Sequence, residues 1–154
     1  MKRKSFQKAV CPIARALDTI GDWWSLLIIR NAFAGQRRFG EFQKSLGMAR
    51  NILTVRLRKL VDCGVLELVP ASDGSAYREY ALTKKGRGLF HALEALRQWG
   101  AANLFEAGEP TKILVERENG RPVRNFELRS GEGRLLSPEE TLLLLAKTIP
   151  AQTL

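Results

Sequence analysis

The pattern of residues 49–62 restricts the fold of this chain more than any other feature. Leu53, Leu57, Leu60 and Val61 recur at a spacing that places them on one face of an α-helix. The opposite face is polar and basic, so one side packs into a core and the other meets solvent or a ligand. An ordinary amphipathic helix, whose polar face is only solvated, shows the same division. The neighbouring segments decide whether the polar face of this helix is solvated or binds a ligand.

The residues before this helix predict a helix-turn-helix motif. Residues 39–46 place Phe39, Phe42 and Leu46 on one helical face, and Gly47 separates this short helix from the next. A short helix, a glycine-containing turn and a second helix with an exposed basic face are the components of that motif.

Two further helices are expected nearer the N-terminus. Residues 12–20 begin with Pro12, which suits a first helical turn, and Gly21 ends the helix. Asp22 can cap the next helix, residues 23–34, whose middle is too apolar for a solvated face. That helix is expected to be central to the core.

After the basic helix the pattern becomes extended. Residues 65–69 and 77–82 favour strands, with Asp73-Gly74 between them as the turn, and helix, helix, hairpin is the order of a winged helix. A helix over residues 84–105 would then span about 30 Å, more than so small a core needs. The surplus predicts packing against a second subunit, unless the helix simply covers its own domain.

We therefore expect an α+β, mainly α fold: a winged helix-turn-helix domain with a C-terminal β-hairpin plus short helix appendage. Asn119-Gly120 marks the turn of that hairpin, and Ser137-Pro138 opens the short helix, which is expected to end near Pro150. The expected division is a basic N-terminal tail (1–10), a DNA-binding and dimerisation domain (11–105), a linker (106–111) and the appendage (112–154).

The positive charge of the chain is unevenly distributed. The formal net charge is +9; residues 1–105 hold 18 Lys or Arg against 8 Asp or Glu, whereas residues 106–154 hold 7 against 8. This excess indicates an anionic partner, usually nucleic acid, although a basic surface that binds nothing has the same composition.

Residues that carry most enzyme chemistry are scarce. Two cysteines, Cys11 and Cys63, and one histidine, His91, are too few for a disulfide framework or an ordinary zinc site. The sequence shows no glycine-rich phosphate loop and no nucleophile elbow, so we expect no enzyme, no metal and no cofactor. No run of about 18 apolar residues would span a membrane, and the cysteines fit a reducing, cytoplasmic location.

The exposed side chains of the helix over residues 49–62 match the hydrogen-bonding groups of DNA. Arginine can bridge guanine O6 and N7, asparagine can bridge adenine N6 and N7, and threonine offers a methyl group and a hydroxyl. The residues expected to read or flank bases are Arg50, Asn51, Thr54, Val55 and Arg58. Those expected mainly to contact phosphates are Arg37, Arg38, Lys59 and Arg78.

A series of short motifs runs through residues 11–105. It comprises Cys11-Pro12 and the segments 21–30, 38–42, 47–54, 56–60, 64–66, 80–86 and 96–100. In these motifs the chain resembles the HxlR-type winged-helix transcription regulators, which are relatives of the MarR group. The resemblance implies a homodimer, joined through terminal helices, that binds a near-palindromic operator on double-stranded DNA close to a gene that it controls.

Two positions have a particular meaning within that family. Many members have serine where Ala49 stands; without the hydroxyl the helix loses an N-cap worth about 1 kcal/mol, and its first N–H groups are freer to meet a phosphate. Some members sense oxidants, quinones or aldehydes through a cysteine near Cys11, where Lys8 and Arg15 would favour a reactive thiolate. A small packed cysteine is the alternative, and Cys63 is expected in the core.

The expected function is a sequence-specific, duplex-DNA-binding transcription regulator, a homodimeric repressor with a small-molecule or oxidant effector. Two alternatives stay open. A basic winged helix can be an interaction module for protein or RNA, and salt-dependent DNA binding without preference for any fragment would favour that function. In a small-molecule sensor, Trp23, Trp24, Trp99 and the appendage would line a pocket.

Overall fold

The structure, a computed structural model, describes residues 5–144. It divides into two compact units, Met1–Arg97 and Gln98–Leu154, and the boundary falls within the last long helix. Among the described residues, no helix is long and apolar enough to cross a membrane.

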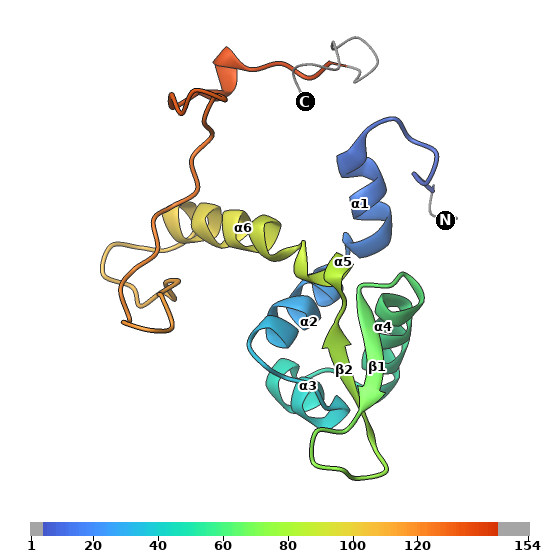
Figure 1. Ribbon diagram of the computed structural model, residues 1–154. Coiled ribbons are helices and arrows are strands. Elements are labelled where there is room, and N and C mark those ends of the chain that lie inside the picture. Colours follow the sequence, from blue (N-terminus) through green and yellow to red (C-terminus); the bar gives the residue numbers. More distant parts are fainter. Residues whose placement is uncertain (1–4, 145–154) are drawn as a thin grey trace. The chain divides into compact units, whose positions relative to one another are not determined.

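The first unit contains a helix-turn-helix followed by a two-stranded hairpin (Figure 1). This order confirms the winged-helix fold that the sequence predicts. Its elements are α1 (Pro12–Ile20), α2 (Trp23–Phe33), α3 (Phe39–Leu46), α4 (Arg50–Asp62), β1 (Leu66–Pro70), β2 (Arg78–Leu82) and α5 (Lys84–Arg87); α6 (Phe90–Asn103) begins in this unit and ends in the second.

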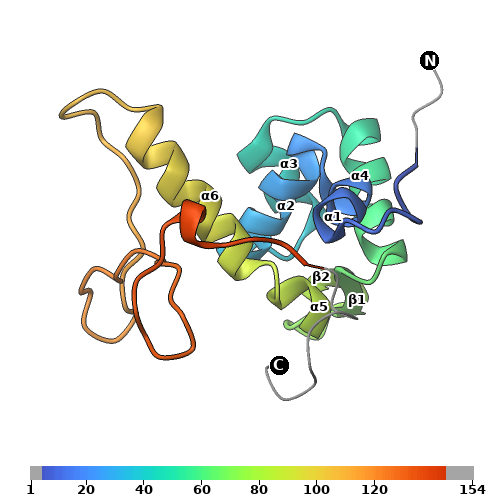
Figure 2. The same ribbon diagram turned by 90° about the horizontal axis from the view of Figure 1, so that it is seen from above.

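The apolar stripe of α4 forms the centre of the core. Leu53, Leu57 and Leu60 have no exposed surface, as their helical spacing predicts. They pack in one cluster with side chains from α2, α3 and β1, including Ile28, Ile29, Phe42 and Leu66. Figure 2 shows α2, α3 and α4 grouped together, with the hairpin at one side of the group.

The turn between α3 and α4 depends on a glycine. Gly47 ends α3 in the left-handed conformation, with φ of 62°, which costs a residue with a side chain more than it costs glycine. A second glycine permits a close approach: a Cβ at Gly86 would lie 2.1 Å from the carbonyl oxygen of Val65. The start of α5 therefore packs directly against the chain that leads into β1.

The hairpin pairs β1 and β2 antiparallel, with Leu68 opposite Tyr80. The segment before α3 lies along its free edge, because the N–H of Tyr80 donates to the carbonyl of Arg37 at 2.8 Å. The ring of Tyr80 also packs edge-on against Phe42 of α3, with 6.2 Å between centroids. The wing is thus joined to the helix-turn-helix by backbone and by core contacts.

The expectation of one helix over residues 84–105 is wrong. Residues 88–89 form a turn that separates α5 from α6, which has 14 residues. The physical reason is the pair Gly86 and Gly88, since glycine has low helix propensity. The single long helix is therefore replaced by a short turn of helix and an element of about 21 Å.

The second unit has less regular structure than the sequence predicts. The turn at Asn119-Gly120 is present, with the Gly120 N–H donating to Glu116 O at 2.9 Å. In place of a regular hairpin there are isolated bridges, Val115 to Pro122 and Arg129 to Leu135. Pro122, which lies two residues after Gly120, has no N–H to donate, which limits the pairing there.

The helix expected from Ser137 to Pro150 is also wrong over its described part. The carboxylate of Glu140 accepts the N–H of Ser137 at 2.9 Å, so the expected cap forms. The helix is only the 3-10 turn η1 (Pro138–Glu140), and Thr141 is already extended. Leu143 is 97% exposed, so no packing surface supports a longer helix there. Residues 145–150 lie outside the described part.

Candidate nucleic-acid interface

The five residues predicted to read or flank bases share the exposed face of α4. Their side chains lie opposite the buried stripe, and all are exposed: Arg50, Asn51, Thr54, Val55 and Arg58. Val55 is 61% exposed although it is apolar. Burial of the stripe fixes the rotation of α4 about its axis, so these side chains point away from the core together.

The N-terminal end of α4 is open, and one of its arginines is held in place. Ala49 occupies the N-cap position without a side-chain hydrogen bond, as its lack of a hydroxyl predicts. The guanidinium of Arg50 lies over the ring of Phe39, 5.3 Å from its centroid. The Thr54 hydroxyl donates to the Arg50 carbonyl at 2.8 Å, which leaves its methyl group on the outer surface.

Asp22 connects the start of α2 to α4. Its carboxylate accepts the N–H and the hydroxyl of Ser25 at 2.9 Å and 2.7 Å, and it lies 3.4 Å from Arg56 Nε and 3.6 Å from Lys59 Nζ. Burial opposes ionisation, but these hydrogen bonds and the two cations hold the pKa of Asp22 below its ordinary value of 3.8. Lys59, expected at a phosphate, therefore already has an anionic partner.

A second carboxylate, Glu79 on β2, is buried at the base of the wing. Its side chain is 3% exposed, and it lies 2.8 Å from Arg37 Nε and 3.2 Å from Arg38 Nε. The Ser72 hydroxyl donates to it at 3.1 Å. Burial alone would raise the pKa of Glu79, but the hydrogen bonds from Arg38 and Ser72 and the charge of Arg37 hold it below its ordinary value.

The two arginines of this cluster are among the four residues predicted to contact phosphates. Arg38 also donates from Nη2 to Asp73 at the wing tip, at 2.5 Å, and this bond lowers the pKa of Asp73. The backbone N–H groups of Arg37 and Arg38 both donate to Glu41 of α3, at 2.7 Å and 2.8 Å, and lower its pKa. The sequence did not predict that Glu79 is buried beside Arg37 and Arg38. Alternation of side chains along a strand does not show that another segment lies against the edge of that strand.

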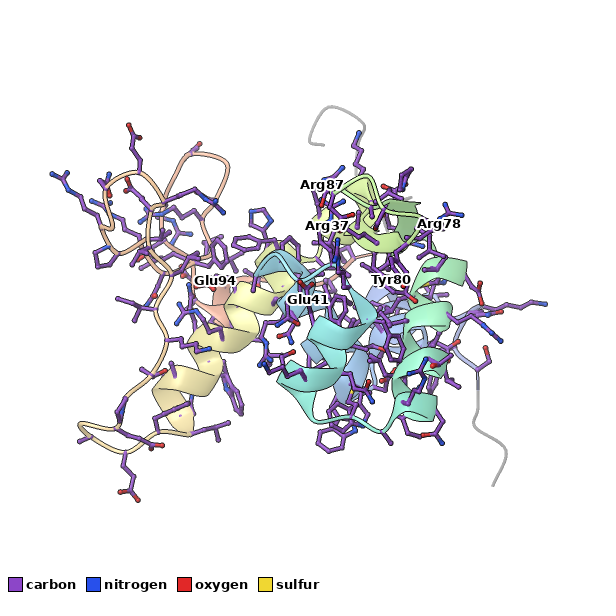
Figure 3. All side chains as sticks on the ribbon, turned by 90° about the horizontal axis from the view of Figure 1, so that it is seen from below. Arg37, Glu41, Arg78, Tyr80, Arg87 and Glu94 are labelled. Atoms are coloured by element: carbon purple, nitrogen blue, oxygen red, sulfur yellow. The ribbon has the colours of Figure 1, made fainter. Side chains whose placement is uncertain are left out.

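Arg78 folds back along the hairpin. Its Nη2 donates to the carbonyl of Leu68 on β1 at 2.6 Å, and the side chain stays exposed. Figure 3 shows Arg78 and Tyr80 on the hairpin and Arg37 beside it. A phosphate that binds Nη2 of Arg78 would therefore displace this carbonyl.

The two cysteines lie in different environments. Cys11 is exposed and occupies the N-cap position of α1. Cys63 is half-buried against the core, as expected, and its Sγ lies 3.4 Å from the carbonyl oxygen of Leu60. Within residues 5–144, no group of three His, Cys, Asp or Glu side chains is placed to hold a metal ion.

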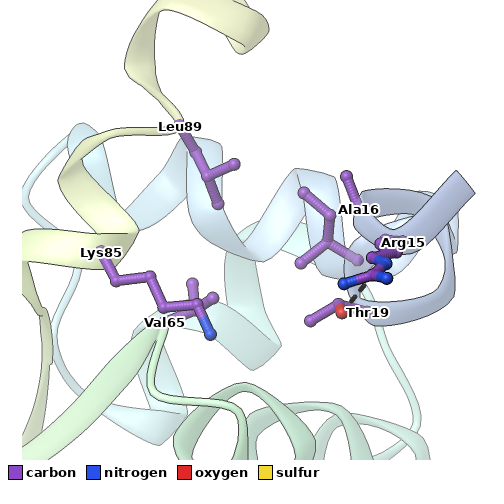
Figure 4. Close-up of a pocket in the computed structure, with 7 residues that line it drawn as sticks. Arg15, Ala16, Thr19, Val65, Lys85 and Leu89 are labelled. Carbon is purple, nitrogen blue, oxygen red and sulfur yellow. Dashed lines mark hydrogen bonds between the residues drawn. The ribbon is translucent and has the colours of Figure 1, made fainter. Parts of the chain in front are cut away.

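A cavity of about 250 Å³ lies between α1, α5 and the start of β1 (Figure 4). Ile20, Val65 and Leu89 provide apolar lining, and Arg15 and Lys85 lie on opposite sides. Both cations donate to backbone carbonyls, Arg15 to Ala9 and Lys85 to Cys63. None of the residues predicted to contact DNA lines this cavity.

Comparison with known proteins identifies the family. Residues 19–107 match the sequence profile described as HxlR-like helix-turn-helix. The chain belongs to this family. The expected resemblance is thereby confirmed, and the family and its named members are transcription regulators rather than enzymes.

Individual relatives agree with this assignment. An HTH-type transcriptional regulator of Mycobacterium tuberculosis, Rv3095, is 48% identical over 102 residues, which cover 66% of this chain and 65% of that protein. The crystal structure of PA1607, described as a candidate transcription factor, is 53% identical with a TM-score of 0.86, covering 92% of this chain and 99% of that one. The redox regulator HypR, in its oxidised form, is 30% identical with a TM-score of 0.54, covering 60% and 97%.

We expect Asp22→Asn to weaken the attachment of α4 while keeping α2 capped, since asparagine is also a good N-cap. At neutral pH the free energy of unfolding should fall by about 0.5–1 kcal/mol. Because the pKa of Asp22 is lowered on folding, its contribution is complete above pH 3.8 and is lost as the pH falls through the folded-state pKa. Urea unfolding of the wild type and of Asp22→Asn, measured from neutral to acid pH, should show the difference in their free energies of unfolding shrinking towards acid pH. A difference that does not change with pH would contradict the ion pairs of Asp22.

Proposed function

We propose that this protein is a homodimeric transcription repressor that binds a near-palindromic operator on double-stranded DNA, with α4 in the major groove. The observation that carries the proposal is the exposed face of α4, which presents arginine, asparagine and apolar side chains opposite the buried side chains of Leu53, Leu57 and Leu60. Membership of the HxlR-like helix-turn-helix family supports this role. So does the excess of positive charge in residues 1–105.

The side chains on this face suit direct reading of bases. Arg50 and Arg58 can each bridge guanine O6 and N7, and Asn51 can bridge adenine N6 and N7. Val55, with its methyl groups exposed, suits the methyl group of thymine. Because these residues stand on a helix whose rotation is fixed by the core, a single docking position presents all of them to the groove.

The surrounding cations are assigned to phosphates. Arg37 and Arg38 lie at the base of the wing, Arg78 lies on the wing, and Lys59 lies on α4 beside Asp22. Such contacts set the register of the protein on the duplex without reading sequence. The uncapped start of α4 offers N–H groups to a further phosphate.

Exposed apolar faces support a homodimer. On α1 and just before it, Val10, Ile13 and Leu17 are 77%, 64% and 52% exposed, and on α6 Leu96 and Trp99 are 51% and 56% exposed. A second copy covering these faces would remove apolar surface from water. Two copies related by a two-fold axis place two α4 helices into successive major grooves, about 34 Å apart. We propose repression as the mode of control, in which a dimer bound to an operator that overlaps a promoter would exclude other proteins from it.

Arg58→Ala tests the reading of bases. On an operator isolated by selecting DNA fragments with the purified protein, we expect a loss of about 1–3 kcal/mol in binding free energy and relaxed preference at one base pair. Arg117→Ala is the matched control, since it removes the same charge from an exposed site in the second unit. Equal losses of operator affinity for the two variants in a gel-shift titration would contradict the assignment of Arg58 to base reading. Wild-type binding without any sequence preference would favour an interaction module.

Ile13→Glu tests the dimer. The residue is 64% exposed, so the substitution should leave the fold of one chain intact while placing two buried charges in the proposed interface. We expect sedimentation velocity to show a dimer for the wild type and for the control Lys44→Glu, and a monomer for Ile13→Glu. A wild-type chain that sediments as a monomer at micromolar concentration would contradict the proposal.

Cys11 supports a second candidate function, control of DNA binding by an oxidant. Its thiol is exposed at the N-cap of α1, the helix whose apolar face is assigned to the dimer. An exposed thiol is accessible to an oxidant in solution. HypR, a relative of matching fold, is a redox regulator.

Cys11→Ser tests this candidate. Treatment with hydrogen peroxide should weaken operator binding of the wild type by at least about tenfold, as a coupling of about 1.4 kcal/mol would, and dithiothreitol should restore it. We expect no response from Cys11→Ser and a wild-type response from the control Cys63→Ser. A Cys11→Ser protein that still responds would exclude this thiol as the sensor.

A further inference from the structure

We propose that the two carboxylates bound to Arg38 have opposite effects on DNA binding. Glu79 positions Arg37 and Arg38 for phosphates and so strengthens binding, whereas Asp73 competes with phosphate for Arg38 and so weakens it. The inference rests on the proposed DNA-binding function, within which it assigns a positioning residue and an internal competitor.

The position of Glu79 suits a positioning role. It is buried at the base of the wing, and each of its oxygens faces the Nε of one arginine, Oε2 at 2.8 Å from Arg37 and Oε1 at 3.2 Å from Arg38. Arg38 donates a hydrogen bond from Nε to Glu79, which sets the plane of its guanidinium and leaves the Nη groups to other anions. The contact of Arg37 with Glu79 is an ion pair without hydrogen-bond geometry, so it holds the charge of Arg37 at the wing without setting the plane of its guanidinium. The side chains of both arginines are 44% exposed, so solvent and ligands reach them.

The backbone also holds this arrangement. The N–H of Tyr80 donates to Arg37 O at 2.8 Å, and the Ser72 hydroxyl donates to Glu79 Oε1 at 3.1 Å. The segment before α3 and the wing are thus joined on either side of the carboxylate. Loss of the Glu79 charge would free the side chain of Arg37 from the wing and leave Arg38 held by Asp73 alone, although the charges of both arginines would remain.

Asp73 is placed as a competitor. It lies beside the turn at Gly74, which has φ of 73°, and its carboxylate is 50% exposed. It accepts from Arg38 Nη2, the part of the guanidinium that Glu79 leaves available. Ion pairs between exposed side chains are weak. A DNA phosphate offers Arg38 the same hydrogen-bonding geometry and the same single charge as a carboxylate, and the neighbouring phosphates of the duplex add to the attraction. A phosphate that binds Nη2 of Arg38 therefore displaces Asp73.

The signs of two substitutions separate this proposal from simple electrostatics. Replacing either carboxylate by its amide removes one negative charge from a surface that meets DNA, and charge alone would tighten binding in both variants. Positioning predicts tighter binding for Asp73→Asn and weaker binding for Glu79→Gln. Asparagine keeps the Oδ1 that accepts the N–H of Ser75 at 3.0 Å, so the turn is preserved.

The test measures affinity for the selected operator and for an unrelated duplex by fluorescence anisotropy over a range of salt concentrations. We expect Asp73→Asn to bind both duplexes about threefold more tightly. Glu79→Gln should bind about fivefold more weakly at physiological salt, with a salt slope smaller by about one for each phosphate that the variant no longer neutralises. Glu67→Gln, which removes an exposed charge from β1, is the matched control and should stay within about twofold of the wild type.

Tighter binding of Glu79→Gln, or an unchanged salt slope, would overturn the positioning role, and an unaltered affinity of Asp73→Asn would overturn the competition. Circular dichroism and thermal unfolding report whether Glu79→Gln still folds. If it does not, the pair Arg38→Gln and Arg38→Gln/Asp73→Asn decides, because the gain from Asp73→Asn must disappear when Arg38 is absent. Wild-type protein that binds no duplex would instead refute the proposed function itself.

Discussion

Burial of Leu53, Leu57 and Leu60 sets the rotation of α4, and most of the first unit follows from it. Once these side chains pack against α2 and β1, the opposite face of the helix is directed outwards as one surface. Asp22 adds a second constraint, because it caps α2 and binds Arg56 and Lys59 on α4. The two helices therefore resist independent rotation, which is what a surface that reads bases requires.

Five of the basic residues predicted to contact DNA fall into two groups with different environments. Arg50 and Arg58 stand on the exposed face of α4, where they can meet bases. Arg37, Arg38 and Lys59 are paired with carboxylates. In the proposed function, paired cations add less net charge to the encounter with DNA, but their side chains are partly ordered before binding, so less conformational entropy would be lost on contact. In this proposal the excess positive charge attracts DNA, and the ion pairs hold some of the cations in place before DNA binds.

Local signals account for the elements that were predicted well. The bounds of α3 agree at both ends, because Gly47 stops it, and the hairpin strands differ from prediction by about one residue, an ordinary uncertainty for element ends. Prediction failed where local signals conflicted or lacked a partner. The prediction of one helix over residues 84–105 did not take account of the low helix propensity of Gly86 and Gly88. The prediction of a helix after Ser137 failed because the exposed leucines that follow η1 have no packing surface among the described residues. Amphipathic spacing predicts which face of a helix would be buried. It does not predict whether another part of the protein is present to pack against that face.

The amino-acid sequence by itself determined the buried stripe of α4, its exposed polar face, the turn at Gly47 and the absence of a side-chain cap at Ala49. These follow from helical periodicity and from the chemistry of single residues. Only the tertiary structure decided which arginines are paired. Glu79 and Arg38 are 41 residues apart, and they meet because the segment before α3 lies along the edge of β2. A contact of that kind depends on how the hairpin folds back on the helices, which no local pattern in either segment specifies.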